Sequence, residues 1–202
     1  MKQKTIIREW VEAIVIAVIL ALTIRTFVVQ AFKIPSGSME TTLLVGDHLL
    51  VNKFIYGIKI PFTSTRILTF NKPQRGDIIV FIYPEDRKKD FIKRVVGVEG
   101  DRVEIINKKV YINGSQFNNP FAMNSDDIII SKGIQPRDNY GPVVVPRDSL
   151  FVMGDNRDHS YDSRYWGFVK LEDVKGKAFI IYWSWDRLES SLRWGRIGNL
   201  IH

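Results

Sequence analysis

A short serine-rich segment is the part of this sequence best suited to nucleophilic chemistry. Residues Pro35–Met39 read PSGSM, with Ser36 and Ser38 on either side of Gly37. A serine in a tight turn can attack a carbonyl carbon while nearby N–H groups stabilise the resulting oxyanion. A serine hydroxyl is inert near neutral pH unless a base accepts its proton. A plain surface loop is the alternative interpretation.

Three side chains are candidates for that base. His48 heads a predicted strand, His159 lies in a polar loop, and Lys93 lies within the apolar segment DFIKRVV. Because side chains alternate along a strand, Phe91, Lys93 and Val95 share one face. Apolar neighbours lower the pKa of an ammonium group from about 10.4, which would make Lys93 a usable base. An exposed lysine on a strand is the alternative, and the pattern alone leaves all three candidates open.

A third motif, residues 154–167, reads GDNRDHSYDSRYWG and is rich in aspartate and arginine. The spacing does not fit a calcium-binding loop, because no glycine stands sixth and no glutamate twelfth from Asp155 or Asp158. Its aspartates and arginines can instead cross-pair and brace the loop, leaving Ser160 and Ser163 to orient another group. We expect no bound metal and no cofactor.

The elements that must position these motifs are short strands. Apolar stretches alternate with turn signals after Phe32, and none sustains a helical period for ten residues. The predicted strands are His48–Tyr56, Asp77–Tyr83, Phe91–Val98, Arg102–Ile106, Lys109–Ile112, Ser149–Met153 and Lys177–Tyr182. Asn107-Lys108 predicts a tight hairpin, and Pro136 to Pro142 predicts a loop. The pattern favours an antiparallel β sandwich or barrel of about 170 residues.

The N-terminal segment has a different character. Ala13–Ile24 carries no charge, and as a helix the longer stretch Val11–Val29 would measure about 28 Å, close to the thickness of a hydrocarbon core. A retained membrane anchor is favoured over a signal peptide cleaved near Ala31 and over a buried core helix. A cytoplasmic N-terminus is indicated by the basic residues that precede the segment, Lys2, Lys4 and Arg8.

Composition excludes several classes of protein. Apolar types make up 45% and charged types 25% of 202 residues, which is typical of a globular chain. The absence of cysteine excludes a disulfide scaffold, a cysteine nucleophile and thiolate metal sites. The net charge of +7 leaves anionic partners open. Lipid headgroups and nucleic acid both remain candidates for the C-terminal basic and aromatic residues, namely Trp183, Trp185, Arg187, Arg193, Trp194 and Arg196.

Four segments taken together resemble the bacterial signal peptidase I family. They occur in the family's order, and they read IPSGSM followed by TLLVGDHLLV, then RGDIIVFIYPED, DFIKRVVGVEGD and GDNRDHSYDSRYWGFV. The resemblance implies a membrane-anchored Ser/Lys endopeptidase that removes signal peptides from exported preproteins. It also implies a mainly β fold, with an antiparallel β-sheet catalytic domain and one N-terminal transmembrane helix. We therefore expect an anchor over residues 1–31 and a catalytic domain over 32–202, with a short second subdomain or hairpin insertion at about 100–150.

The resemblance also implies roles for individual residues. Ser38 corresponds to the nucleophile and Lys93 to the general base. Ser36 would complete an oxyanion hole with the backbone N–H of Ser38, and Ser160 would hold the amine of Lys93. Two supporting ion pairs are implied, Asp155 with Arg94 and Asp162 with Arg164.

Shallow pockets for small side chains at the −1 and −3 positions of the substrate are implied as well. Their expected lining is Phe32, Ile34, Pro35, Met39, Leu43, Val80, Phe91 and Ile92. We expect preprotein signal peptides and the lipid bilayer as partners, no nucleic acid, and a monomer. The expected location is the bacterial cytoplasmic membrane, crossed once, with the catalytic domain on the outer side. A Ser/His hydrolase using His48 or His159 and a nucleic-acid-binding protein are the alternatives.

Overall fold

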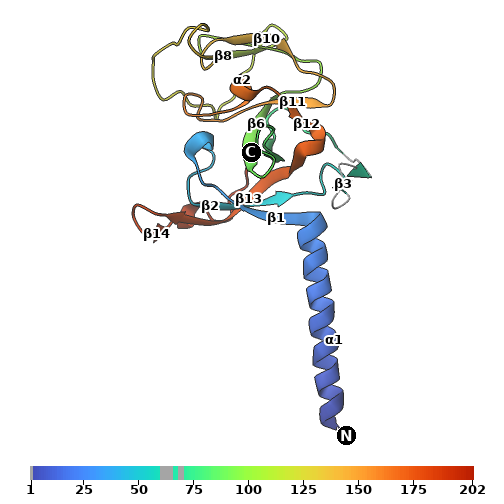
Figure 1. Cartoon of the computed structure of the whole chain (residues 1–202). Helices are drawn as coiled ribbons and strands as arrows, with labels where there is room; N and C mark the ends of the chain where they lie inside the picture. Colours follow the sequence, from blue (N-terminus) through green and yellow to red (C-terminus); the bar gives the residue numbers. More distant parts are fainter. Residues whose placement is uncertain (1, 60–65, 68–70) are drawn as a thin grey trace.

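The computed structural model describes residues 2–59, 66–67 and 71–202, and shows a long N-terminal helix attached to a β-rich domain (Figure 1). The helix α1 spans Lys2–Thr23 and continues into a π-helical turn, η1, at Ile24–Val28. The other helical segments are short: η2 Gly37–Met39, α2 Ser163–Trp166, η3 Leu171–Asp173 and η4 Trp194–Arg196.

Helix α1 extends away from the domain, and every residue from 6 to 25 is exposed. The interpretation of this segment as a buried core helix is therefore wrong. Within the described parts of the chain, no helix has both the length and the apolar character needed to cross a membrane. The expected transmembrane helix is thus not found. Arg8, Glu9 and Glu12 lie in the first half of α1, and the charge-free part that follows, Ala13 to Thr23, is only about 16 Å long.

The motifs singled out in the sequence lie on or beside a large antiparallel sheet. Its strands follow the order β1-β2-β13-β5-β6-β11-β12, and β14 pairs with β13. Their bounds are β1 Val29–Lys33, β2 Asp47–Asn52, β5 Ile78–Ile82, β6 Asp90–Gly97, β11 Ser149–Met153, β12 Val169–Lys170, β13 Val174–Asp186 and β14 Ser191–Leu192. A two-stranded sheet joins β3 Ile58–Lys59 to β4 Arg66–Ile67. The prediction of a mainly antiparallel β fold is confirmed.

A second sheet has the order β10-β7-β8-β9 and lies at the end of the domain farthest from α1 (Figure 1). Its strands are β7 Arg102–Ile106, β8 Lys109–Ile112, β9 Ser115–Gln116 and β10 Tyr140–Val144. The turn between β7 and β8 places Asn107 and Lys108 at positive φ, 49° and 67°. This is the tight hairpin that Asn107-Lys108 predicts.

The core forms on both faces of the main sheet. Along β5, Ile78 and Val80 pack into one apolar cluster, while Ile79 and Phe81 pack into another on the opposite face. This alternation follows from the two-residue period of a strand that is covered on both sides. A third cluster joins the main sheet to the second sheet, with Val96 and Phe151 packed against Val103.

Candidate active site

The nucleophile candidate lies in a single turn of 3-10 helix that follows strand β1. Ser38 is the central residue of η2, and its neighbour Met39 is fully buried in the apolar cluster beneath. The backbone N–H of Leu43 donates to the Met39 carbonyl at 2.8 Å, which closes the turn onto that cluster. The turn is therefore held by packing, while the Ser38 side chain stays partly exposed.

Strand β6 brings Lys93 to this serine. Lys93 Nζ and Ser38 Oγ are 2.5 Å apart and hydrogen-bonded, although 55 residues separate them in the chain. Lys93 pairs across the sheet with Ile79 of β5, so a central strand sets its position. Among the described residues, the Lys93 amine makes no other side-chain hydrogen bond.

Burial makes this lysine unusually acidic. Lys93 is 4% exposed, and its amine lies 5.7 Å from the centre of the Phe91 ring. The pKa of Lys93 falls from 10.5 to about 8, chiefly because burial desolvates the ammonium group. The charges of Asp162 and Asp155 oppose this shift, and the charge of Arg164 adds to it. Roughly one Lys93 side chain in ten is then neutral at pH 7. A neutral amine within hydrogen-bond distance of a serine hydroxyl can accept its proton.

The segment at residues 154–158 holds the nucleophile turn from the other side. The backbone N–H of Asn156 donates to the Ser38 carbonyl at 3.2 Å, and its side-chain amide donates to the Gly37 carbonyl at 3.3 Å. A Cβ on Gly154 would collide with the Ser38 carbonyl and the Ser160 hydroxyl, so only glycine allows this approach. Sequence reasoning missed Asn156, whose position within the GDNRD motif was its only signal.

Two buried ion pairs flank the dyad. Arg94 grips Asp155 through two hydrogen bonds of 2.8 and 2.7 Å, and both side chains are almost fully buried. Arg164 grips Asp162 in the same manner at 2.8 and 2.9 Å. Arg164 also donates to the carbonyl of Arg157 at 2.6 Å, which ties the loop together. Fork-shaped contacts of this kind fix geometry as well as charge.

The contact expected from Ser160 to Lys93 is not found among the described residues, while Ser36 lies in the same pocket as Ser38. Ser160 is buried, but its Oγ accepts from the Gly154 N–H at 3.1 Å and bonds to Asp162. Within the described residues Ser160 makes no hydrogen bond to Lys93, because its hydroxyl donates to the carboxylate of Asp162 instead. Ser36 is exposed and caps no N–H of η2. Its side chain lies on the rim of a pocket that also contains Ser38.

That pocket is the cleft that gives access to the dyad. It has a volume of about 400 Å³ and is lined by Ser36, Gly37, Ser38, Glu40, Phe91, Lys93, Asn156, His159 and Tyr161. Of the residues expected to line substrate pockets, Phe91 lines this pocket and the others are not among its lining residues. Four of them, Ile34, Met39, Leu43 and Val80, are buried in one cluster, on which Phe32 and Ile92 pack while partly exposed. Pro35 is exposed.

Neither histidine makes a hydrogen bond to Ser38 among the described residues. His48 lies on β2, opposite Lys33 of β1, with its ring edge-on to Tyr182. Burial, and then the charge of Lys33, lower the pKa of His48. His159 is exposed on the wall of the active-site pocket. The geometry therefore favours Lys93 over both as the base.

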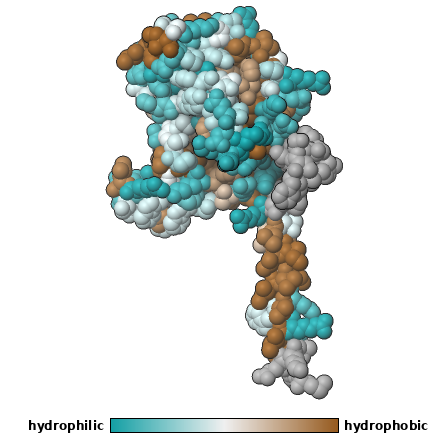
Figure 2. Space-filling view, viewed as in Figure 1, coloured by the Kyte–Doolittle hydropathy of each residue, from teal (hydrophilic) through white to brown (hydrophobic). Residues whose placement is uncertain are grey.

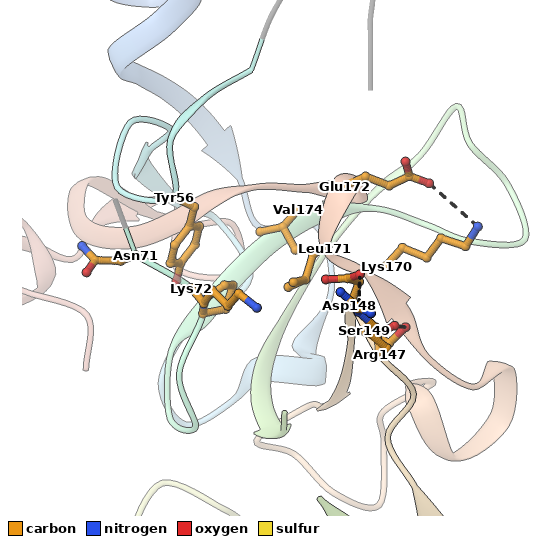
Figure 3. Close-up of a pocket in the computed structure, with 11 residues that line it drawn as sticks. Tyr56, Asn71, Lys72, Arg147, Asp148, Ser149, Lys170, Leu171, Glu172 and Val174 are labelled. Carbon is orange, nitrogen blue, oxygen red and sulfur yellow. Dashed lines mark hydrogen bonds and ion pairs between the residues drawn. The ribbon is translucent and has the colours of Figure 1, made fainter. Parts of the chain in front are cut away.

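A larger hollow of about 540 Å³ lies elsewhere on the domain, and Figure 3 shows the side chains around it. Tyr56, Leu171 and Val174 give it apolar walls, and it contains neither member of the dyad. Lys170 on its rim faces Glu172 at 3.8 Å. The cationic side chains around it form ion pairs with nearby acids, Lys72 with Glu99 and Arg147 with Asp148, so the described residues give no reason to expect an anionic ligand here.

Comparison with known proteins identifies the family of the chain. Residues 7–183 match the family described as signal peptidase, peptidase S26. The chain belongs to this family. Signal peptidase I of Pseudomonas aeruginosa is 36% identical over 217 residues, which covers 91% of this chain and 75% of that protein. Signal peptidase I of Pseudomonas fluorescens is 40% identical over 195 residues, covering 82% of this chain and 69% of that protein.

A crystal structure of a signal peptidase I from Enterococcus faecalis is 32% identical in sequence. It covers 54% of this chain and 98% of its own, with a TM-score of 0.43. Membership in peptidase S26 makes this protein a serine peptidase, a hydrolase whose family removes signal peptides. The resemblance inferred from the four sequence motifs is confirmed.

Proposed function

We propose that this signal peptidase cleaves exported preproteins after small residues at −1 and −3, with Ser38 as nucleophile and Lys93 as general base. The observation that carries the proposal is the 2.5 Å hydrogen bond between Ser38 Oγ and a lysine amine that is 4% exposed. An exposed lysine would be almost entirely protonated at neutral pH and could accept nothing.

The reaction follows from this geometry. Neutral Lys93 takes the proton of Ser38, and the serine oxygen attacks the carbonyl carbon of the scissile peptide bond. The carbonyl oxygen becomes an oxyanion, which the backbone N–H of Ser38 and the hydroxyl of Ser36 stabilise. Protonated Lys93 then gives its proton to the leaving amine as the C–N bond breaks. A water molecule, deprotonated by Lys93, hydrolyses the acyl-enzyme and restores Ser38.

We attribute selection for small residues to steric exclusion by the apolar cluster that contains Met39, the neighbour of Ser38. Ile34, Met39, Leu43 and Val80 are at most 2% exposed, and they pack into the core rather than opening a deep hole. A side chain larger than alanine at −1 would have to displace these close-packed residues, which costs free energy. Phe91 and Ile92 on β6 supply the partly exposed apolar walls.

The dyad is tested with purified full-length enzyme and a preprotein substrate. We expect Ser38→Ala and Lys93→Ala each to lower the cleavage rate by at least about three orders of magnitude. Circular dichroism should show the same fold in both variants. Retention of activity in Lys93→Met together with its loss in His48→Ala or His159→Ala would overturn the assignment in favour of a Ser/His hydrolase.

We further propose that α1 attaches the catalytic domain to the cytoplasmic membrane, with the N-terminus on the cytoplasmic side and the domain on the outer side. The apolar side chains along α1 are exposed, and Figure 2 shows them as a brown surface on the helix that extends from the domain. The hairpin of β13 and β14 lies at the end of the domain from which α1 leaves (Figure 1). It exposes Trp185 and Leu188, and Trp194 is exposed in η4, which follows β14.

Attachment is tested by flotation of the full-length chain with phospholipid vesicles. We expect the wild type to float, and the double variant Ile16→Glu, Leu20→Glu to stay in the dense fraction, because each buried charge costs about 3 kcal/mol. Arg8→Lys is the matched control and should float. Both variants should cleave a soluble peptide at the wild-type rate. A wild type that never floats would refute attachment and leave the dyad assignment untouched.

A further inference from the structure

The second sheet contacts the active-site loop, residues 154–158, through the tip of the β7–β8 hairpin. Lys108, the second residue of that tip, extends toward Asp158, and its amine donates to both carboxylate oxygens at 3.0 Å. The same amine donates to a carboxylate oxygen of Asp126 at 2.8 Å. The side chain of Asp158 is fully buried and that of Lys108 is 10% exposed, so solvent hardly screens the pair.

Asp158 in turn binds residues 123–126, a segment of chain without regular structure that we call the strap. Its carboxylate accepts from the backbone N–H groups of Ser125 at 2.7 Å and Asp126 at 3.1 Å. Arg137 approaches the same carboxylate at 3.8 Å and grips Asp126 at 2.8 Å. This carboxylate therefore joins three segments that are far apart in the sequence: the hairpin tip, the strap and the active-site loop.

The strap and the nucleophile turn hold the loop from opposite sides. Met123 of the strap donates to the Asp155 carbonyl and accepts from the Arg157 N–H, both at 2.8 Å. The N–H of the residue between them, Asn156, points the other way and donates to the Ser38 carbonyl at 3.2 Å. Successive N–H groups of an extended chain point in opposite directions, so whatever displaces residues 155–157 also displaces Ser38.

We propose that Lys108 is a positioning residue for catalysis, acting through Asp158 and Asn156 on the place of Ser38 relative to Lys93. The inference rests on the proposed function. It assigns to the second sheet a part in the reaction, although no hydrogen bond between the described residues joins that sheet directly to the side chains of Ser38 and Lys93. Burial alone would lower the pKa of Lys108, but its hydrogen bonds to Asp126 and Asp158 outweigh that effect and raise it. Lys108 therefore stays charged wherever the enzyme works.

The test compares Lys108→Met with Lys109→Met in the full-length enzyme, assayed well below the unfolding temperature of both. Lys109 is the next residue of the same hairpin and is exposed. We expect Lys108→Met to lower kcat roughly tenfold or more, because small displacements of reacting groups are costly, and to leave KM within about twofold. Lys109→Met should match the wild type. An unchanged kcat with a lower Tm would mean that Lys108 only stabilises the fold, and would overturn the proposal.

A double-mutant cycle tests the route. If Lys108 acts through Asp158, the double variant Lys108→Met, Asp158→Asn should be no slower than the slower of the two single variants. Multiplied effects would show independent action and refute the route. Cleavage by the wild type is measured in the same series, so failure of the proposed function would be visible as inactive wild type rather than as an unaltered ratio between variants.

Discussion

Two shielded lysines, one in each sheet, have opposite protonation behaviour. Lys93 on β6 contacts the hydroxyl of Ser38 and the ring of Phe91, and its pKa falls to about 8. Lys108 in the β7–β8 turn contacts the carboxylates of Asp126 and Asp158, and its pKa rises. Burial lowers the pKa of both. The difference between a base and a structural cation is therefore made by the partners.

This comparison explains what the two arginine–aspartate pairs near Ser38 and Lys93 do: they keep two carboxylates from pairing with Lys93. Asp155 and Asp162 are the acids whose charges reach Lys93. Each forms a bidentate ion pair with an arginine: Asp155 with Arg94, and Asp162 with Arg164. Neither carboxylate is left to form an ion pair with Lys93, which can consequently lose its proton. Asp158 has no such arginine contact at close range and binds Lys108 instead.

The largest effect on activity is expected from a substitution that places a carboxylate beside Lys93. Phe91 lies two residues before Lys93 on the same face of β6, so Phe91→Glu places an acid next to the amine. We expect the pKa of Lys93 to rise by about one to three, which lowers kcat/KM at pH 7 roughly tenfold to a thousandfold. Phe91→Gln, which removes the same ring but adds no charge, is the matched control.

The pH profile separates charge from lost packing. Because Lys93 must be neutral to act, wild-type kcat/KM should rise about tenfold per pH unit below pH 8 and level off above it. Phe91→Gln should keep this midpoint, whereas Phe91→Glu should move it to higher pH. Equal midpoints in the two variants, or a wild-type optimum below pH 6, would contradict a lysine base in an apolar setting.

The next largest effect is on stability, where the two lysines should give opposite signs. The folded state holds Lys93 with a pKa of about 8 and the unfolded chain with 10.5, so the free energy of unfolding rises with pH between these values. Below pH 8 the buried amine is a penalty. Lys93→Met should remove it and stabilise the fold at pH 7 by up to about 3 kcal/mol.

Lys108→Met should instead destabilise by about 1–3 kcal/mol, since it leaves the buried carboxylate of Asp158 without its cation. Urea denaturation at pH 7 measures both variants against the wild type. Changes of the same sign for both lysines would show that their partners do not distinguish them.

The smallest effects are expected at the histidines. His48→Ala and His159→Ala should leave kcat/KM within about tenfold of the wild type, since neither imidazole bonds to Ser38 in the described structure. A steady-state assay at pH 8 measures both. A larger loss in His159→Ala, whose side chain lines the pocket, would indicate that it contacts substrate.

Much of the architecture follows from local pattern. Strands β7, β8 and β11 begin and end at their predicted residues, because each has alternating or continuous apolar character between clear turn signals. Strand β10 was predicted as a loop, since Pro142 and Gly141 disfavour strands. It forms because it is an edge strand, where a missing N–H is tolerated. The expected anchor over residues 1–31 takes in the first three residues of strand β1, because Val29 and Ala31 continue the apolar character of the helix before them.

For the site, the sequence by itself determined which chemistry is available. The absence of cysteine and a serine in a glycine turn point to a serine nucleophile with Lys93, His48 or His159 as its base, and the resemblance to signal peptidase I favours Lys93. Alternation along one strand is enough to place Lys93 on the same face as Phe91. Only the tertiary structure decided which groups meet. Ser160 bonds Asp162 rather than Lys93, Asn156 holds the nucleophile turn, and Lys108 reaches the active-site loop from another sheet. These contacts join residues far apart in the chain, and no local pattern encodes the partner of a polar side chain.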